Sequence, residues 1–168
     1  RFHPDNIKEL HNTSEEVDEL ILPPVFRVIS AVLDHINYDL SGETACVVAN
    51  ADIFKDNLAT YLQKKGAEVL VAGIDDQDIK EKSSQADVLI TAVGKPEIIS
   101  GDMIKEDAVV IDVGISRGED GKVHGDVDQE SAAEKAGYLT PVPGGVGPMT
   151  VAATLENVTR MYKSKIRN

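Results

Sequence analysis

The sequence predicts an α/β fold in which a doubly wound parallel sheet lies between helices, within a single domain that spans residues 1–168. Short apolar runs, each long enough for one buried strand, alternate with stretches whose apolar residues recur at helical spacing. The chain has 168 residues, of which 42% are hydrophobic and none is Trp, so it can bury a sizeable aliphatic core. These observations favour one compact domain.

The expected elements follow one another at short intervals. Apolar residues at helical spacing after Pro23 and Pro24 predict a helix that ends near a turn at 39–42. Continuous apolar runs farther along predict buried strands, and the amphipathic stretches between them predict helices. In order, we expect a strand at 44–49, a helix that includes 58–65, a strand at 68–72, a helix at about 77–84, a strand at 87–93, a short helix after 100–101 and a strand at 108–113.

The remaining part of the chain begins with a polar excursion. Residues 116–126, with a Gly-Glu-Asp-Gly run at 118–121, predict a hairpin. Asp128 is a favoured residue type at a helix N-cap and predicts a helix that continues to Lys135. A last short strand at 138–140 then leads into a run rich in proline and glycine.

That run, at 140–150, is the most informative segment of the chain. Its three prolines each fix one backbone φ, and its three glycines leave no Cβ in the way of a ligand. A helix is expected to open at Met149 or Thr150, so its free N–H groups would lie beside the turn. The pattern indicates either a ligand-facing loop or a plain connection between a strand and a helix.

Five loops are expected to meet at one edge of the sheet. The carboxyl ends of parallel strands share an edge, and ligands bind beyond it at the point where the strand order reverses. The loops are 49–57, 73–76, 94–96, 114–116 and 143–148. Their convergence favours a binding site over five unrelated turns.

Two blocks of sequence resemble the bifunctional methylenetetrahydrofolate dehydrogenase/cyclohydrolase family. One is Pro-Gly-Gly-Val-Gly-Pro-Met-Thr-Val at 143–151, and the other runs from 92–96 through 101–105 to 109–115. Phe2-His3-Pro4 resembles the segment that follows the family's catalytic half, and the likeness continues to about Lys163. Since the resemblance covers only the nucleotide-binding half and the chain begins with Arg, we expect a fragment that lacks the N-terminal catalytic domain.

The resemblance implies a Rossmann-like domain that binds NAD or NADP. The family oxidises 5,10-methylenetetrahydrofolate and hydrolyses the methenyl product to 10-formyltetrahydrofolate, a step of one-carbon metabolism linked to purine biosynthesis. It further implies a tetrahydrofolate derivative as ligand, a homodimer, and Ile115 and Thr150 beside the cofactor. The residues that would line the folate cleft are Pro143, Gly144, Gly145, Val146, Gly147, Pro148, Met149, Thr150 and Val151.

The family's proton-handling residues have no counterpart here. They are a Tyr-x-x-x-Lys helix, a Gln and an Asp, and all of them precede the region that this chain matches. We therefore assign no catalytic residue between Arg1 and Asn168. We also expect the isolated chain to be inactive, because general acid and base groups are needed for the chemistry.

The first loop departs from the family pattern. The family surrounds the cofactor's phosphates with Gly-Arg-Ser followed by Val-Gly-x-Pro, whereas this chain has Ala49, Asn50 and Ala51 and no glycine up to Asn57. Without glycine the backbone cannot approach a pyrophosphate as closely. The family's Cys-Thr-Pro-x-Gly also appears as Leu-Pro-Pro-Val-Phe at 22–26. These changes on the expected cofactor surface predict weakened or altered cofactor binding.

Acidic residues after the second expected strand bear on the choice of cofactor. Rossmann-type sites use a carboxylate at such a place to bind the ribose hydroxyls and to reject a 2′-phosphate. Asp75 is our candidate, which favours NAD over NADP. The alternative is that Asp75, Asp76 or Asp78 caps a helix. Asp112, within an apolar strand, is expected to accept backbone or hydroxyl hydrogen bonds in a structural role.

Charge and composition exclude other classes of ligand. A formal net charge of −12 opposes binding to nucleic acid or to an anionic membrane, and no apolar run is long enough to span a bilayer. The four histidines show no metal-ligand spacing, so we expect no metal. The lone Cys46 cannot form an internal disulfide and is expected in a buried strand. We therefore expect a soluble, cytoplasmic protein that binds a small molecule.

Two further interpretations stay open. A non-catalytic relative with a degraded cofactor loop could serve as a scaffold or dimerisation module. A generic α/β dehydrogenase domain for another small substrate is the third, although two colinear blocks of resemblance disfavour it. A Tyr-x-x-x-Lys segment upstream of this chain would support the enzyme, and its absence would favour the scaffold.

Overall fold

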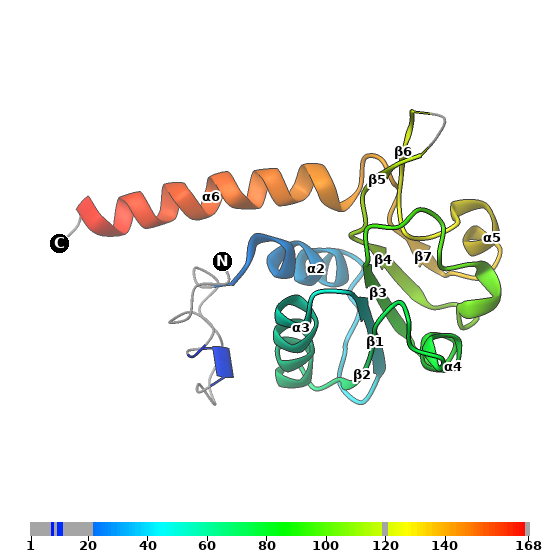
Figure 1. Ribbon diagram of the computed structural model, residues 1–168. Coiled ribbons are helices and arrows are strands. Elements are labelled where there is room, and N and C mark those ends of the chain that lie inside the picture. The colour runs from blue at the N-terminus through cyan, green and yellow to red at the C-terminus, as the bar shows by residue number, and fades with distance from the viewer. Residues whose placement is uncertain (1–7, 9, 12–21, 119–120, 167–168) are drawn as a thin grey trace.

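A central parallel sheet with helices on both faces forms the body of the protein, and one long helix extends from it (Figure 1). The computed structural model describes residues 8, 10–11, 22–118 and 121–166. The motif at 2–4 and the tip of the expected hairpin at 119–120 lie outside the described residues. The predicted α/β class with a doubly wound parallel sheet is confirmed.

The sheet has five parallel strands in the order β2-β1-β3-β4-β7. The chain passes from β1 to the edge strand β2 and then returns across β1 to β3. The strand order therefore reverses at β1, which creates a switch point between β1 and β3. The strands are β1 (Thr44–Ala49), β2 (Glu68–Ala72), β3 (Val88–Ala92), β4 (Val109–Asp112) and β7 (Tyr138–Leu139).

Side chains of β1 alternate between two separate cores. Val47 and its neighbours at 45 and 49 pack with α2 (Pro24–His35) and α3 (Asp52–Lys64) on one face. Cys46 and Val48 belong to the core on the other face, which carries the short helices. This alternation is the period of two expected for an extended strand. The short helices are α4 (Ile79–Ser83), the 3₁₀ helix η1 (Gly101–Met103) and α5 (Gln129–Ala133).

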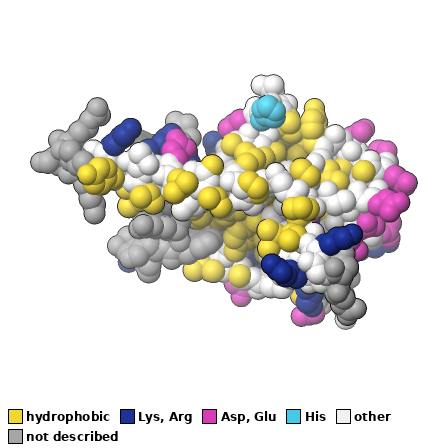
Figure 2. Space-filling view, turned by 90° about the horizontal axis from the view of Figure 1, so that it is seen from above, with side chains coloured by type: hydrophobic (Ala, Val, Ile, Leu, Met, Phe, Trp, Pro, Cys, Tyr) yellow, Lys and Arg dark blue, Asp and Glu magenta, His cyan; other side chains and the backbone are white. Residues whose placement is uncertain are grey.

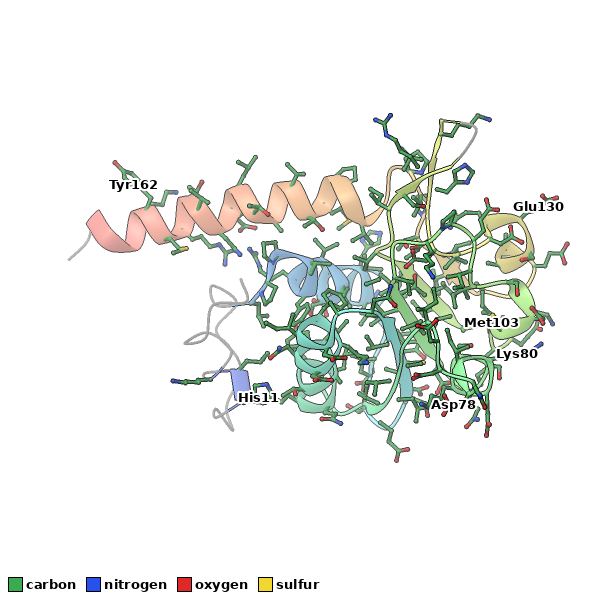
Figure 3. The ribbon with its side chains drawn as sticks, in the orientation of Figure 1. His11, Asp78, Lys80, Met103, Glu130 and Tyr162 are labelled. Atoms are coloured by element: carbon green, nitrogen blue, oxygen red, sulfur yellow. The ribbon has the colours of Figure 1, made fainter. Side chains whose placement is uncertain are left out.

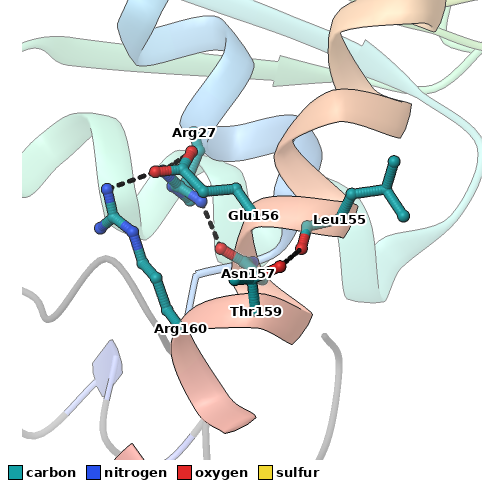
Figure 4. A network of polar contacts seen from close by, with 6 residues as sticks. All are labelled: Arg27, Leu155, Glu156, Asn157, Thr159 and Arg160. Carbon is teal, nitrogen blue, oxygen red and sulfur yellow. Dashed lines mark hydrogen bonds and ion pairs between the residues drawn. The ribbon is translucent and has the colours of Figure 1, made fainter. Parts of the chain in front are cut away.

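The long helix that extends from the body is α6 (Val146–Ile166), and it packs against α2. Arg27 of α2 joins the two helices, because its guanidinium donates hydrogen bonds to Asn157 and, at 2.9 Å, to Glu156 (Figure 4). No helix in the described parts of the chain is both long enough and apolar enough to cross a membrane.

The outer face of α6 carries an apolar stripe that faces solvent. Val151, Leu155, Val158 and Tyr162 are 62%, 64%, 54% and 67% exposed. They recur at helical spacing, so they lie along one side of the helix. Hydrophobic side chains follow α6 in Figure 2, and Tyr162 points away from α2 in Figure 3.

Most expected elements are present, but two helices begin earlier than predicted. The strands at 44–49 and 68–72 have the expected bounds, and the hairpin consists of β5 (Ser116–Arg117) and β6 (Val123–His124). Helix α3 begins at residue 52 because no glycine or proline interrupts the sequence after β1. Helix α6 begins at residue 146, since Pro148 lies in the first turn, where its missing N–H leaves no helical bond unmade.

Candidate functional site

The turn after β1 is much shorter than the loop that the sequence predicted. Ala49 is the buried last residue of the strand, and α3 begins three residues later. Only Asn50 and Ala51 separate the two elements, and both are exposed. The start of α3 therefore lies directly beside the switch point, where its N–H groups and positive dipole end favour an anion.

Charged and polar side chains partly occupy this turn. Asp52 in the first turn of α3 forms an ion pair with Lys55, with 3.0 Å between Oδ1 and Nζ. The Asn50 side chain reaches across the switch point, where its Nδ2 donates to the carbonyl oxygen of Val93 at 3.1 Å. The Asp52 carboxylate would oppose a phosphate at this helix start.

Phe26 does not face this edge of the sheet. Its side chain is fully buried, with its ring stacked on Tyr61 at a centroid distance of 6.0 Å and edge-on to Phe54 at 5.6 Å. The expectation that the change at 22–26 alters the cofactor surface is therefore wrong for the Phe26 side chain. The large ring instead fills the core between α2 and α3.

The loop after β2 carries the acidic residues expected to contact ribose. Asp75 is exposed at the edge strand of the sheet, while the neighbouring Asp76 accepts a hydrogen bond from the N–H of Gly73 at 2.8 Å. Asp78 occupies the N-cap position of α4, but its side chain makes no capping hydrogen bond and pairs with Lys82 at 2.9 Å. All three residues are exposed, and because Asp76 and Asp78 are engaged within the protein, Asp75 remains the candidate for binding ribose.

Two buried carboxylates organise the loops after β3 and β4. Asp112 accepts hydrogen bonds from the hydroxyl of Thr91 at 3.1 Å and from the N–H groups of Gly114, Asp126 and Val127 at 2.9, 3.1 and 3.0 Å. Its expected structural role is confirmed. Asp126 was missed in the sequence, because it lies in a hairpin segment that gives no sign of burial.

The Asp126 side chain binds the backbone of the loop that follows β3. Its carboxylate accepts from three consecutive N–H groups, those of Val93, Gly94 and Lys95, at 2.6, 2.8 and 3.1 Å. Burial raises the pKa of both Asp112 and Asp126, and the backbone donors oppose that rise. The N–H groups of 93–95 are therefore bound to the protein's own anion.

The glycine-rich turn is shorter than predicted, because α6 begins at residue 146. The Val142–Pro143 peptide bond is cis, Gly144 has a φ of 109°, and Gly145 donates its N–H to the carbonyl of Pro141 at 2.9 Å. Gly147 already belongs to α6. Met149 and Val151 are exposed, whereas Val146 is buried in the core, so the side chain of this member of the expected folate-lining set is not at the surface.

The residues expected at the nicotinamide come from two adjoining segments. Ile115, 62% exposed, follows β4, and its Cδ1 would lie 3.7 Å from a Cβ placed on Gly147. The Thr150 hydroxyl donates to the carbonyl oxygen of Val146 at 2.9 Å. An exposed apolar side chain therefore lies beside the glycine-containing start of α6.

A parallel sheet with a switch point, a helix that starts beside it and loops that converge at its carboxyl edge define a Rossmann-like nucleotide-binding domain. Residues 23–166 match the family model described as the tetrahydrofolate dehydrogenase/cyclohydrolase, NAD(P)-binding domain. The chain belongs to this family.

Similar proteins include the bifunctional protein FolD of Hydrogenobaculum sp., 44% identical over 98% of this chain and 58% of that protein. FolD of Aquifex aeolicus is 43% identical over 98% of this chain and 55% of the relative. The chain thus spans just over half the length of these curated relatives.

Solved structures give the same result. The Campylobacter jejuni FolD structure superposes with a TM-score of 0.89 at 40% identity and covers 98% of this chain and 57% of that one. The Trypanosoma brucei enzyme, solved with NADP cofactor and an inhibitor, gives 0.90 at 31% identity and covers 99% of this chain and 58% of that one.

Proposed function

We propose that this chain is the nucleotide-binding part of a bifunctional methylenetetrahydrofolate dehydrogenase/cyclohydrolase. The whole protein would oxidise 5,10-methylenetetrahydrofolate with NAD or NADP and then hydrolyse the methenyl product to 10-formyltetrahydrofolate. The observation that carries the proposal is the family match over residues 23–166. One relative that bears the bifunctional name shares 51% identity with this chain over 126 residues.

The residues at the carboxyl edge fit a dinucleotide, with a reduced contact to its phosphates. Ala49, Asn50 and Ala51 would lie below the phosphates beside the start of α3, and Asp75 would bind the ribose hydroxyls. Ile115 and Thr150 would adjoin the nicotinamide, which when bound would supply the hydride acceptor for oxidation of the folate's methylene carbon. The absence of glycine at 49–51 supports weaker phosphate binding.

The folate would occupy the cleft beside the glycine-rich turn. Pro143, Gly144, Gly147 and the exposed side chains of Met149 and Val151 are the proposed lining on this side. Proton transfer would belong to the part of the protein that precedes these residues, since no acid or base can be assigned here. We further propose a homodimer in the cytoplasm, without nucleic acid or membrane partners.

Calorimetric titration of the 168-residue chain with NAD and with NADP tests the cofactor part of this proposal. We expect NAD to bind modestly and NADP very weakly, because Asp75 and Asp52 oppose additional phosphate charge. Tight NADP binding would contradict the interpretation of the loop. If neither nucleotide binds, the non-catalytic scaffold becomes the better description.

A further inference from the structure

Asp112 and Asp126 lie beneath the proposed site and belong to no step of the proposed reaction. We infer that Asp126, held in place by Asp112, is a positioning residue that fixes the ligand-facing loops of the nucleotide site relative to one another. This inference rests on the proposed function for the identity of the ligand. Its structural content, the coupling of the loops through two buried carboxylates, can be tested without any ligand.

The first step concerns the hydrogen bonds between the Asp126 carboxylate and the backbone of the loop after β3. Both carboxylate oxygens are used, one by Val93 and the other by Gly94 and Lys95. Three consecutive donors that converge on one carboxylate determine the direction of the backbone, and charge-assisted bonds of this kind are strong. The loop is therefore fixed in one conformation before any ligand arrives.

The second step joins this loop to the end of β4. Asp112 belongs to β4, and its carboxylate accepts the backbone N–H of Asp126. Asp112 therefore fixes the backbone from which the Asp126 carboxylate extends. The same oxygen of Asp112 accepts the N–H of Gly114, the residue that precedes the exposed Ile115. The place of the proposed nicotinamide neighbour thus depends on the same pair of carboxylates.

The third step extends the connection to two of the three remaining loops of the site, those after β1 and β7. The carbonyl oxygen of Val93 accepts from the Asn50 side chain, which lies in the turn proposed to adjoin the phosphates. The backbone N–H of Asp112 donates to the hydroxyl of Thr140, where the glycine-rich turn begins, at 2.9 Å. Loops from β1, β3, β4 and β7 therefore share one hydrogen-bonded network.

Both carboxylates are closely surrounded, so the neighbouring positions 114 and 125 have no room for a side chain. A Cβ on Gly114 would lie 2.0 Å from the Asp126 carboxylate, and a Cβ on Gly125 would lie 2.0 Å from Oδ2 of Asp112. Within the described residues, no buried side-chain nitrogen or oxygen lacks a hydrogen-bond partner. An amide at position 126 would turn an NH₂ group toward backbone N–H donors, which is a mismatch that no rotation removes.

The test compares Asp126→Asn with a matched control, Asp128→Asn. Asp128 lies two residues farther along, where its carboxylate accepts from Glu130 and Ser131 at the start of α5 and touches none of the four loops. Hydrogen exchange of backbone amides is measured by NMR, and binding of NADH and NADPH is measured by fluorescence on the same samples. Melting temperatures report the stability of each variant.

In Asp126→Asn we expect fast exchange at 93–95, whose N–H groups bind the Asp126 carboxylate, while the amides of β1 and β3 stay protected. We also expect nucleotide affinity to fall about tenfold, the effect of one lost charge-assisted hydrogen bond. Asp128→Asn should show neither change and keep nearly the same melting temperature, because Asn caps a helix about as well as Asp. Unchanged exchange at 93–95 in a folded Asp126→Asn protein would overturn the inference, as would an equal loss of affinity in the control.

Two further outcomes are decisive. If Asp126→Asn does not fold, Thr91→Val removes one hydroxyl donor from Asp112 at nearly constant shape, and faster exchange at 93–95 and 114 is then required. If the wild-type chain binds neither nucleotide, the proposed function fails, but the exchange comparison still decides whether Asp126 positions these loops. Unchanged exchange in Thr91→Val would contradict the inference.

Discussion

Gly144 and Gly145 in the turn before α6 and Gly147 in its first turn differ in what their backbones require. Gly144 has a φ that side chains rarely adopt, and a Cβ on Gly145 would lie 2.4 Å from the carbonyl oxygen of Pro141. Both glycines are therefore needed by the turn itself. A Cβ on Gly147 would meet only the end of Ile115 at an ordinary distance, so the protein alone gives no steric reason for glycine there.

We predict that Gly147→Ala will keep the stability of the fold while lowering the affinity for nucleotide and for a folate analogue severalfold. Alanine is favoured over glycine within a helix, so any change in stability should be small or favourable. Gly145→Val is the contrasting variant and should lose roughly 1–3 kcal/mol of stability from overpacking. Calorimetric titration and thermal unfolding of both variants check this. Unaltered affinity in Gly147→Ala would show that the position faces no ligand.

Cys46 provides a prediction about a single buried side chain. Burial raises the pKa of its thiol to about 12, and the side chain is fully enclosed in β1. Because only the thiolate reacts, we expect no modification by a disulfide reagent at about neutral pH while the protein stays folded. The same reagent should modify one thiol at once in denaturant. Rapid modification without loss of helical circular dichroism would contradict the structure around β1.

At the scale of elements, the turn between β1 and α3 decides how phosphates are held. We predict that restoring Gly-Arg-Ser at Ala49, Asn50 and Ala51 will raise NADP affinity about tenfold or more, because an arginine supplies charge-assisted bonds to phosphate. Titration calorimetry measures the gain. Ala49→Gly alone is the control, since it relieves the backbone without adding charge. Equal affinity of the triple variant and the native chain would show that this turn does not contact phosphate.

The bounds of the elements show what local sequence can and cannot predict. β1 and β2 were predicted to the residue because their apolar runs have clear ends, at Thr44 and Asn50 for β1 and at Glu68 and Gly73 for β2. The starts of α3 and α6 were placed too late, since no capping side chain marks the first, and a glycine and a proline at 147 and 148 obscure the second.

Individual residues of the site were harder to predict from the sequence than the bounds of the strands. Asp112 gave a signal because a carboxylate within an apolar strand needs partners. Asp126 gave none, because the N–H groups that it binds lie 31 to 33 residues earlier in the chain. Contacts of this kind arise only when the loops of a folded sheet meet.

At the scale of the whole molecule, this chain carries the proposed binding surface, and we assign no proton-transfer group to it. We therefore predict that the purified 168-residue chain has neither dehydrogenase nor cyclohydrolase turnover above background. The absorbance of reduced nicotinamide and of methenyltetrahydrofolate measures the two reactions. A full-length relative assayed in parallel serves as positive control. Turnover by the chain would mean that an acid or base within it has been overlooked.

The apolar stripe on α6 also affects how copies of the chain behave in solution. The exposed apolar surface formed by Val151, Leu155, Val158 and Tyr162 favours self-association. The net charge of −12 opposes it, because copies of the chain repel one another. Added salt weakens the repulsion, because it shortens the electrostatic range to about 10 Å at roughly 0.1 M, and leaves the apolar attraction in place. Light scattering from the chain should therefore rise with ionic strength, the reverse of what association through ion pairs would give.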